Sequence, residues 1–369
     1  ISFLGAGAYS HYIPSTVKSI LQRGEFVTAY TPYQPEAAQG TLQVGFEFQT
    51  VICQLTGMEV ANAGMYDGPT AFAEACLMAA RVTKRTRIGV LSSSDARLPE
   101  TLLAYSKHQG IEIVSIDPNA TEIPDDLACI GVQSPNFFGE IEDVERFTNL
   151  THENGALSIV HVNPTALGMF KAPGEFDVDI VTAEGQPLGV PMAFGGPYVG
   201  LFACKKAHIR QMPGRIIGRT TDTRGRVGYA LTLQTREQHI RRERATSNIC
   251  TSTQLIGLMV TVYAATLGKR GLKDLANLCY QKAHYAAAEI DQLGGFSVER
   301  TGPFFHEFVI TCPESPAKIN SALLDRKIIG GLDISDRSDN GMLVCVTETS
   351  SKADIDRLVD ALREIGAGS

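Results

Sequence analysis

The sequence predicts an α/β fold, with a large domain built around a mostly parallel sheet and a small C-terminal α+β domain. Between residues 87 and 205, short runs rich in Ile, Val and Leu alternate with segments of helical spacing. Several of the runs are continuously apolar, which is typical of strands buried on both faces of a parallel sheet. In addition, a length of 369 residues is too great for one ordinary core, so we expect a large domain and a smaller one.

The expected elements of the large domain follow in chain order. Prolines at positions 32 and 35 favour an extended segment, and a long helix is expected over 36–55. A second helix, over 71–82, begins at a turn of small residues. A Gly- and Arg-rich connection over 212–226 then leads through a charged stretch to a long apolar helix at 254–267. Between these parts we expect strands at 87–91, 112–116, 127–132, 157–162, 178–182 and 199–204, with helices at 98–108 and 141–153.

Three parts of the chain are expected. An N-terminal segment takes residues 1–30, the large α/β domain residues 31–270, and the small α+β domain residues 271–369. The best strands of the small domain are 304–311 and 342–347, and an amphipathic helix over 352–365 closes the chain.

Composition excludes several classes of protein. With 33 Lys and Arg against 40 Asp and Glu, the net charge of −7 argues against nucleic-acid binding. The longest apolar run, around 255–265, is too short to span a membrane. The eight cysteines form no CxxC pair, so we expect reduced, buried thiols in a cytoplasmic protein. Because the chain opens with Ile1 rather than Met, we also expect that an N-terminal stretch is missing, with any targeting peptide.

No metal site is predicted, because the eight histidines are scattered and no ligands are paired at short spacing. A GxSxG elbow and a P-loop are absent as well. His161 and His239 are expected to be structural. A loop dense in Gly and Pro, residues 185–197, follows a predicted strand, where α/β sheets place ligands, although packing between elements explains it equally well.

The turn at 62–71 is the first motif with two interpretations. Asp67 suits a helix N-cap and Pro69 suits the first helical turn. Free N–H groups at a helix start also attract phosphate. Helix starts are far commoner than phosphate sites, so taken alone the turn is interpreted as a helix start.

The second motif is Thr246-Ser247-Asn248, which follows a run with three arginines at 241–244. Hydroxyl and amide groups beside guanidiniums can bind an anion from a neighbouring subunit. Taken alone, the favoured interpretation is a solvated helix end, in which Glu237 and Glu243 offset the arginines.

Taken together, several stretches resemble one family. The chain is similar to glycine decarboxylase, the P-protein of the glycine cleavage system (glycine dehydrogenase, aminomethyl-transferring). Within that family it resembles the N-terminal half, which many bacteria make as a separate subunit 1. The resemblance runs from Phe3 nearly to the C-terminus, and relative to the family some tens of N-terminal residues are lacking. It is carried by Tyr30–Glu36 (YTPYQPE), Gln39-Gly40, Asn62-Ala63 with Tyr66-Asp67-Gly68, Ser134–Gly139 (SPNFFG), Met212–Gly218 (MPGRIIG) and the long run Gln234–Thr251.

Membership would imply the PLP-dependent transferase fold type I, with a mostly parallel seven-stranded sheet and a small C-terminal domain. It would also imply a reaction, in which glycine is decarboxylated on pyridoxal phosphate and its aminomethyl group passes to the lipoyl group of the H-protein. The implied partners are glycine decarboxylase subunit 2, in an α2β2 assembly, and the lipoylated H-protein.

The sequence departs from a PLP enzyme in two respects. Such an enzyme needs a lysine for the Schiff base and usually a carboxylate facing the pyridine nitrogen. The resemblance places the lysine in the 178–189 region, but no lysine lies between Lys171 and Lys205. Lys171 precedes the expected strand instead of following it, and Asn163 stands where the carboxylate is expected. We therefore expect no catalytic residue on this chain alone and PLP carried by the partner subunit.

Active sites of this fold lie at a subunit interface, so a chain without the lysine can complete its partner's site. One hypothesis places Tyr30, Thr31, Tyr33 and Gln34 in the wall of the partner's glycine pocket. A second has Thr246, Ser247 and Asn248, backed by Arg244, reaching toward the partner's PLP phosphate. Asp67, Gly68 and Thr70 are interpreted as a vestigial phosphate cup that now serves the structure.

Two alternatives stay open. One is a self-sufficient PLP enzyme related to cysteine desulfurases or class V aminotransferases, and the missing lysine speaks against it. The other is a non-catalytic scaffold or regulatory paralogue. The intact Gln234–Thr251 run favours a retained duty at an active site over that alternative.

Overall fold

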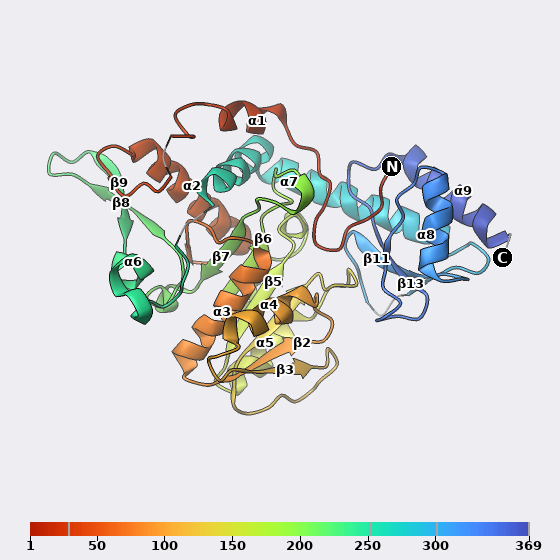
Figure 1. Cartoon of the computed structure of the whole chain (residues 1–369), viewed down its shortest axis with the longest axis horizontal. Helices are drawn as coiled ribbons and strands as arrows, with labels where there is room; N and C mark the ends of the chain where they lie inside the picture. The colour runs from red at the N-terminus through yellow and green to blue at the C-terminus, as the bar shows by residue number, and fades with distance from the viewer. Residues whose placement is uncertain (29, 251–252, 300–301, 368–369) are drawn as a thin grey trace.

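Two sheets organise the chain in the computed structural model, which describes residues 1–28, 30–250, 253–299 and 302–367. A seven-stranded sheet forms the centre of the large domain, and a four-stranded sheet forms that of the small domain (Figure 1). A separate two-stranded hairpin projects from the large domain. The predicted fold class is therefore confirmed.

The large sheet has the order β1-β7-β6-β5-β4-β2-β3. Strands β2 to β6 run parallel to their neighbours, whereas β7 is antiparallel to both β6 and β1. All six predicted strands are present, and the two-residue β1 at the edge was not predicted. The strands are β1 (Val60–Ala61), β2 (Arg87–Leu91), β3 (Glu112–Ile116), β4 (Leu127–Ser134), β5 (Leu157–Val162), β6 (Ile180–Glu184) and β7 (Gly200–Cys204).

Helices cover both faces of this sheet. Successive side chains of a strand point to opposite faces, so Leu201 and Ala203 of β7 join one buried layer while Phe202 and Cys204 join the other. The first layer also holds residues of α2, α5 and α7, and the second holds residues of α3 and α4. Burial on both sides explains why the strands are continuously apolar. The covering helices are α2 (Gln39–Thr56), α3 (Gly68–Thr83), α4 (Arg97–Ser106) and α5 (Val144–Glu153).

The segment expected as a Gly- and Arg-rich connection contains an antiparallel hairpin instead. Strands β8 (Ile216–Thr221) and β9 (Val227–Thr232) pair from Ile216 opposite Thr232 to Thr221 opposite Val227. Most of β8 beyond its first two residues is exposed. A half-exposed strand has no continuous apolar run, and for this reason the sequence did not reveal the hairpin.

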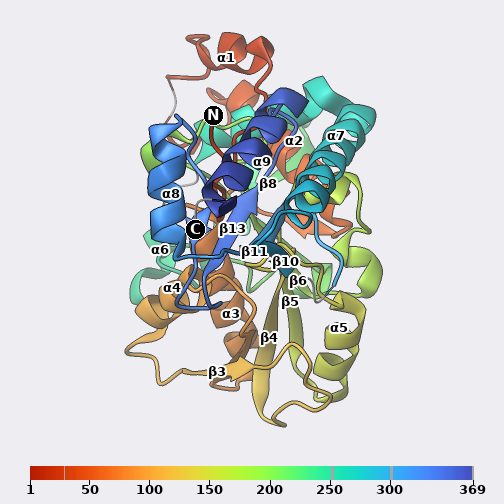
Figure 2. The same ribbon diagram turned by 90° about the vertical axis from the view of Figure 1, so that its right-hand side faces the viewer.

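The long helix α7 (Gln254–Ile290) joins the two domains. It is interrupted at Gly268, whose φ of 59° and ψ of −178° are not helical. The predicted helix over 254–267 is the part before this interruption. The second part packs against the small domain, which Figure 2 shows from its outer side. The small domain contains β10 (Ser297–Glu299), β11 (Glu307–Thr311), α8 (Pro316–Asp325), β12 (Leu332–Asp333), β13 (Gly341–Cys345) and α9 (Lys352–Ala367) in an antiparallel sheet of order β10-β11-β13-β12.

The first residues of the chain pack against the small domain. Phe3 is buried in its core, and the Cys345 N–H donates to the Phe3 carbonyl at 2.9 Å. The chain then crosses to the large domain, where α1 (Ser15–Leu21) packs on α7. Residues 1–12, which we call the N-terminal strap, thus bridge both domains.

All eight cysteines are free thiols, and Cys250 is the exposed one. Within the described part of the chain, no helix combines the length and apolar character needed to cross a membrane.

Adjacent leucines on α4 test the layered core. Leu102 is fully buried and Leu103 is 57% exposed. Leu102→Ala should lower the free energy of unfolding by about 2–5 kcal/mol, because it removes buried methyl groups and leaves a cavity. Leu103→Ala, the matched control, should change it by less than about 0.5 kcal/mol. Urea denaturation followed by circular dichroism would measure both, and equal losses would contradict the assigned burial.

Candidate functional site

A cavity of about 330 Å³ lies where the large domain, the small domain and the N-terminal strap meet. Its floor is formed by the carboxyl ends of parallel strands, the usual ligand position in α/β sheets. The lining residues that matter here come from the strap (Tyr9), the start of α3 (Asp67, Pro69), the segment after β2 (Asp95, Arg97), the end of β5 and the loop after it (His161, Asn163), the end of β6 (Glu184) and the small domain (His306, Glu307).

Carboxylates of the chain itself accept hydrogen bonds from the backbone N–H groups at the start of α3. Asp67 caps the helix, accepting from the Thr70 N–H at 2.8 Å while the Thr70 hydroxyl accepts from the Asp67 N–H. The Gly68 N–H donates to Glu184 Oε2, also at 2.8 Å. A Cβ at Gly68 would lie 2.9 Å from the Glu184 nitrogen, so glycine is needed for this close approach. Carboxylates therefore take the N–H groups that a phosphate would need.

Burial raises the pKa of Glu184 to about 7, although N–H groups of Gly68 and Gln186 donate to its oxygens. Burial also raises the pKa of Glu307 to about 7. Asp95 pairs with Arg97 at the same cavity. Carboxyl groups thus dominate the charge around the cavity.

No lysine is among the described residues that line the cavity. After β6 the chain has Gln186, whose side chain bonds the backbone of Tyr9 in both directions, at 2.8 and 2.9 Å. Lys171 places its Nζ 4.1 Å from the centre of the Phe176 ring, and Lys205 pairs with Asp177 and Asp179. The position that follows β6 therefore anchors the strap.

Asn163 and His161 take part in hydrogen bonds within the fold. Asn163 Nδ2 lies 3.1 Å from His306 Nε2, and its Oδ1 accepts from the Thr165 hydroxyl at 2.7 Å. His161 Nδ1 lies 2.9 Å from the Thr182 hydroxyl, and burial lowers the pKa of His161 to about 4. His161 is therefore a neutral histidine near neutral pH.

Tyr33 belongs to a second group of interacting side chains, outside the cavity lining. Its hydroxyl accepts from Arg215 Nη2 at 2.9 Å, and the guanidinium lies 4.9 Å from the ring centre. The ring meets His239 edge-on at 5.5 Å and keeps 47% of its surface exposed. The structure thus brings the YTPYQPE segment to residues 234–250 of the long run.

Arg215 links the members of this second group. It forms a buried ion pair with Glu237 at 2.7 Å and also donates to the Cys250 carbonyl. Arg236 donates to the Met212 carbonyl, and to that of Gly214 at 3.0 Å. Two stretches that carry the resemblance, around 212–218 and 234–250, are therefore bonded to each other and to Tyr33. Arg215 and Glu237 were not predicted as site residues, although both lie within stretches that carry the resemblance.

The remaining residues of the first hypothesis lie beside Tyr33 along the chain. Tyr30 is 80% exposed and lines a separate hollow of about 520 Å³, together with Phe26 and Leu255 among others. The Thr31 carbonyl accepts from the Tyr33 N–H at 2.9 Å, and the Gln34 carbonyl accepts from the Ala37 N–H. These backbone bonds set the turn that presents Tyr33.

Thr246, Ser247 and Asn248 of the second hypothesis line a third hollow, of about 700 Å³, beside α3, whereas Arg244 does not line it. The Ser247 hydroxyl donates to Glu74 at 2.7 Å, and the Thr246 N–H donates to the Arg236 carbonyl. Asn248 is exposed. Arg244 is exposed as well, and its partner is Glu243 at 3.8 Å, so it does not back Thr246 here. Thr251, the last residue of the run, lies outside the described residues.

Comparisons with known proteins agree with the fold. Residues 1–362 match the family model described as glycine cleavage system P-protein. A probable glycine dehydrogenase (decarboxylating) subunit 1 from Desulfitobacterium hafniense is 52% identical over 376 residues, covering 99% of this chain and 84% of that protein. One of the same description from Thermomicrobium roseum is 50% identical over 380 residues, covering 99% and 85%.

Solved structures extend the likeness. A crystal structure of glycine decarboxylase (P-protein) of the glycine cleavage system, in inhibitor-bound form, matches with a TM-score of 0.95 and 41% identity, over 99% of this chain and 85% of that one. The cysteine desulfurase CsdA from Escherichia coli matches with a TM-score of 0.69 and 14% identity, over 98% and 94%. The second likeness shows the fold alone, the PLP-dependent transferase fold type I.

The ionisation of Glu184 gives a testable pH dependence. Its pKa of about 7 in the fold lies above its ordinary 4.5, so the stability it contributes is complete below the ordinary pKa and is lost as the pH rises through 7. Between about pH 5 and pH 8 this loss amounts to ~2–3 kcal/mol. Glu184→Gln should remove this part of the decline in unfolding free energy, measured by urea denaturation at both pH values.

Glu145, which is exposed on α5, offers the control. Glu145→Gln should keep the full decline. If Glu184→Gln kept it too, the buried carboxyl would not be its source.

Proposed function

The chain belongs to the glycine cleavage system P-protein family, and from this premise we propose that it is a subunit 1 that completes the active site of a PLP-bearing partner subunit. The partner decarboxylates glycine and passes the aminomethyl group to the lipoyl group of the H-protein. On this proposal the chain itself holds no PLP and supplies no Schiff-base lysine.

The observation that carries the proposal is the state of the cofactor position. The cavity at the carboxyl edge of the sheet has no lysine among its described lining residues. The Gly68 and Thr70 N–H groups at the start of α3 donate to Glu184 and Asp67. These residues do not fit PLP, because a phosphate would meet carboxylates in place of free N–H groups. We therefore interpret Asp67, Gly68 and Thr70 as a vestigial cup and assign no chemical step to this cavity.

Tyr33 and its surroundings are the part we assign to the partner's site. Tyr33 is half-exposed while its hydroxyl is fixed by Arg215, which is buried and paired with Glu237. A partly exposed aromatic group on a buried charged support suits the wall of a small polar pocket. We assign Tyr30, Thr31 and Gln34 to the same wall as neighbours in the chain.

Thr246, Ser247 and Asn248 are proposed to reach the partner's PLP phosphate. Ser247 donates to Glu74 in the isolated chain. Docking of the partner would have to exchange this bond for one to the phosphate. Arg244, with its exposed guanidinium, is free to turn from Glu243 toward an anion on the partner.

The proposed assembly has four chains, two of this kind and two of subunit 2. The lipoylated H-protein is the proposed acceptor partner, and the cytoplasm the proposed compartment. The name subunit 1, which the relatives from Desulfitobacterium hafniense and Thermomicrobium roseum carry, supports a partner subunit.

The visible absorbance spectrum of the chain tests the central point. Purified alone, mixed with excess PLP and desalted, the chain should retain no absorbance band of a lysine-bound cofactor, and borohydride should fix no PLP onto it. Co-expression with a lysine-bearing subunit 2 should give both the band and glycine decarboxylation. A band that borohydride fixes onto this chain would overturn the proposal in favour of a self-sufficient PLP enzyme. If subunit 2 assembled with this chain but decarboxylated glycine equally well without it, the scaffold alternative would be favoured.

Two substitutions test the residues assigned to the partner's site. Tyr33→Phe combined with Thr246→Ala should lower kcat/KM of the assembled complex about 10-fold or more, since each lost hydrogen bond contributes ~1 kcal/mol. Tyr229→Phe with Thr50→Ala, on β9 and α2 outside the three hollows named above, is the matched control and should leave the rate unchanged. An unchanged rate in the Tyr33 and Thr246 variant would refute both assignments.

A further inference from the structure

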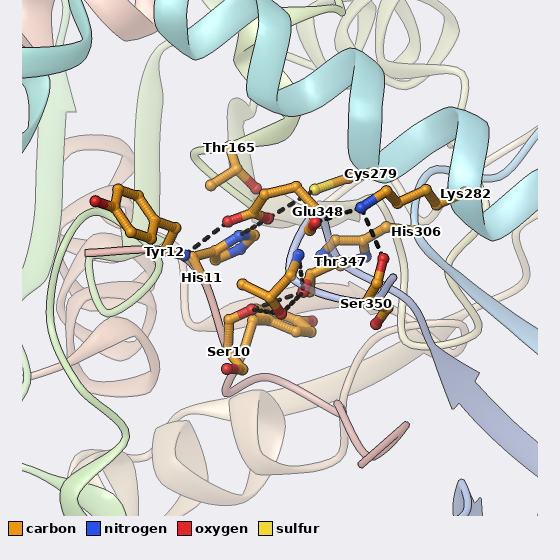
Figure 3. A network of polar contacts seen from close by, with 12 residues as sticks. Ser10, His11, Tyr12, Thr165, Cys279, Lys282, His306, Thr347, Glu348 and Ser350 are labelled. Carbon is orange, nitrogen blue, oxygen red and sulfur yellow. Dashed lines mark hydrogen bonds and ion pairs between the residues drawn. The ribbon is translucent and has the colours of Figure 1, made fainter. Parts of the chain in front are cut away.

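We propose that His11, Cys279 and Glu348 form a binding site for a divalent transition-metal ion, with Zn²⁺ the best match. The three residues come from the N-terminal strap, the second part of α7, and the loop between β13 and α9. Figure 3 shows their side chains pointing toward one another. The site is separate from the cofactor position and does not depend on the proposed function.

The geometry is close to that of a metal site. His11 Nδ1 lies 2.7 Å from Glu348 Oε2, and Cys279 Sγ lies 3.3 Å from the same oxygen. One ligand atom from each residue lies within 4.8 Å of the others. With usual zinc bond lengths, tetrahedral ligand atoms stand about 3.3 to 3.6 Å apart. A movement of His11 by a fraction of an ångström would therefore admit the ion.

The cluster is buried and holds polar atoms without partners. The side chains of His11 and Glu348 are 2% and 9% exposed, and Cys279 is fully buried. His11 Nε2 and the hydroxyl of nearby Tyr263 are buried and make no hydrogen bond in the structure. Tyr263 lies close enough to Glu348 and Cys279 that, after burial itself, their charges raise its pKa. Unsatisfied buried polar atoms are rare in native proteins and call for an explanation. His11 would bind the ion through Nδ1, which leaves its Nε2 unpaired, so the Tyr263 hydroxyl is the unpaired polar atom that could turn to an ion.

The chemistry of the three groups selects the ion. Thiolate, imidazole and carboxylate together are typical ligands of Zn²⁺ and are not those of Ca²⁺ or Mg²⁺. Zn²⁺ would form the sulfur bond as the thiol proton leaves to solvent. One thiolate and one carboxylate then balance the two charges of the ion.

Neighbouring groups leave the carboxylate available. The Lys282 ammonium donates to the carbonyls of Glu348 and Ser350 and not to the carboxylate. The Tyr12 N–H donates to Glu348 Oε1 at 2.7 Å, so Oε2 is the oxygen turned to His11 and Cys279. This N–H bond orients the ligand from outside, as in known metal sites.

An ion here would fasten the strap to α7 and the small domain. His11 is two residues from Tyr9, which lines the cavity, and His306 lies beside both rings. The sequence did not indicate the site, because the three ligands are spread along the chain from residue 11 to residue 348 and have no motif spacing.

Cobalt titration of the whole chain tests the proposal. After removal of metals with a chelator, one equivalent of Co²⁺ should produce the near-ultraviolet band of a cobalt–thiolate bond and intense visible bands of tetrahedral cobalt, and Zn²⁺ should abolish both. Cys279→Ser should remove the thiolate band and weaken Zn²⁺ binding about 100-fold. Cys53→Ser, a half-buried cysteine on α2, is the matched control and should keep the band.

Glu348→Gln provides a second variant in case Cys279→Ser does not fold. It should keep the thiolate band but weaken Zn²⁺ binding at least about 10-fold, with the thermal stabilisation by Zn²⁺ reduced accordingly. No thiolate band in the wild type, or a band that survives Cys279→Ser in folded protein, would overturn the site. In that case the three groups would be a hydrogen-bonded cluster alone.

Discussion

The close approach of α3 to the end of β6 is the contact on which the rest of the site depends. The Gly68 N–H meets Glu184, and no side chain larger than that of glycine fits at this point. The carboxyl groups of Asp67 and Glu184 accept the N–H groups at the helix start. Gln186, two positions after Glu184, then bonds the strap. The strap in turn reaches Glu307 of the small domain through the Tyr9 hydroxyl at 2.7 Å. One set of buried polar bonds therefore closes the cavity from three sides and makes it a structural joint.

The groups of this chain that we assign to the partner's active site lie apart from this joint. Tyr33 and parts of the 234–250 run are exposed or half-exposed, and their support is the buried ion pair between Arg215 and Glu237. Desolvating two charges largely offsets their attraction in such a buried pair, so we interpret the pair as fixing the position of Tyr33. The chain thus separates two tasks that one site performs in a self-sufficient enzyme: holding the fold together at the cofactor position, and presenting groups to a second chain.

Local pattern predicted the strands well and the hairpin poorly, for a physical reason. Strands β2 and β4 to β7 are mostly buried on both faces, so each carries its own apolar signal. By contrast, β8 has Arg219 and exposed threonines and pairs with β9 through backbone bonds. The N-cap at Asp67 was predicted correctly because a cap is a property of a few adjacent residues. Glu184 as its second anion was not predicted, since that contact joins residues 116 positions apart.

The sequence by itself determined the fold class, the helix start at Asp67, the absence of a lysine between Lys171 and Lys205, and the family resemblance carried by short motifs. These depend on residue identity and local spacing. Tertiary structure alone decided that Arg215 joins Tyr33 to Glu237, and that His11 lies beside Cys279 and Glu348. Such contacts arise where chain segments far apart pack together, and burial then makes each polar partner obligatory. No local pattern records which distant group will supply that partner.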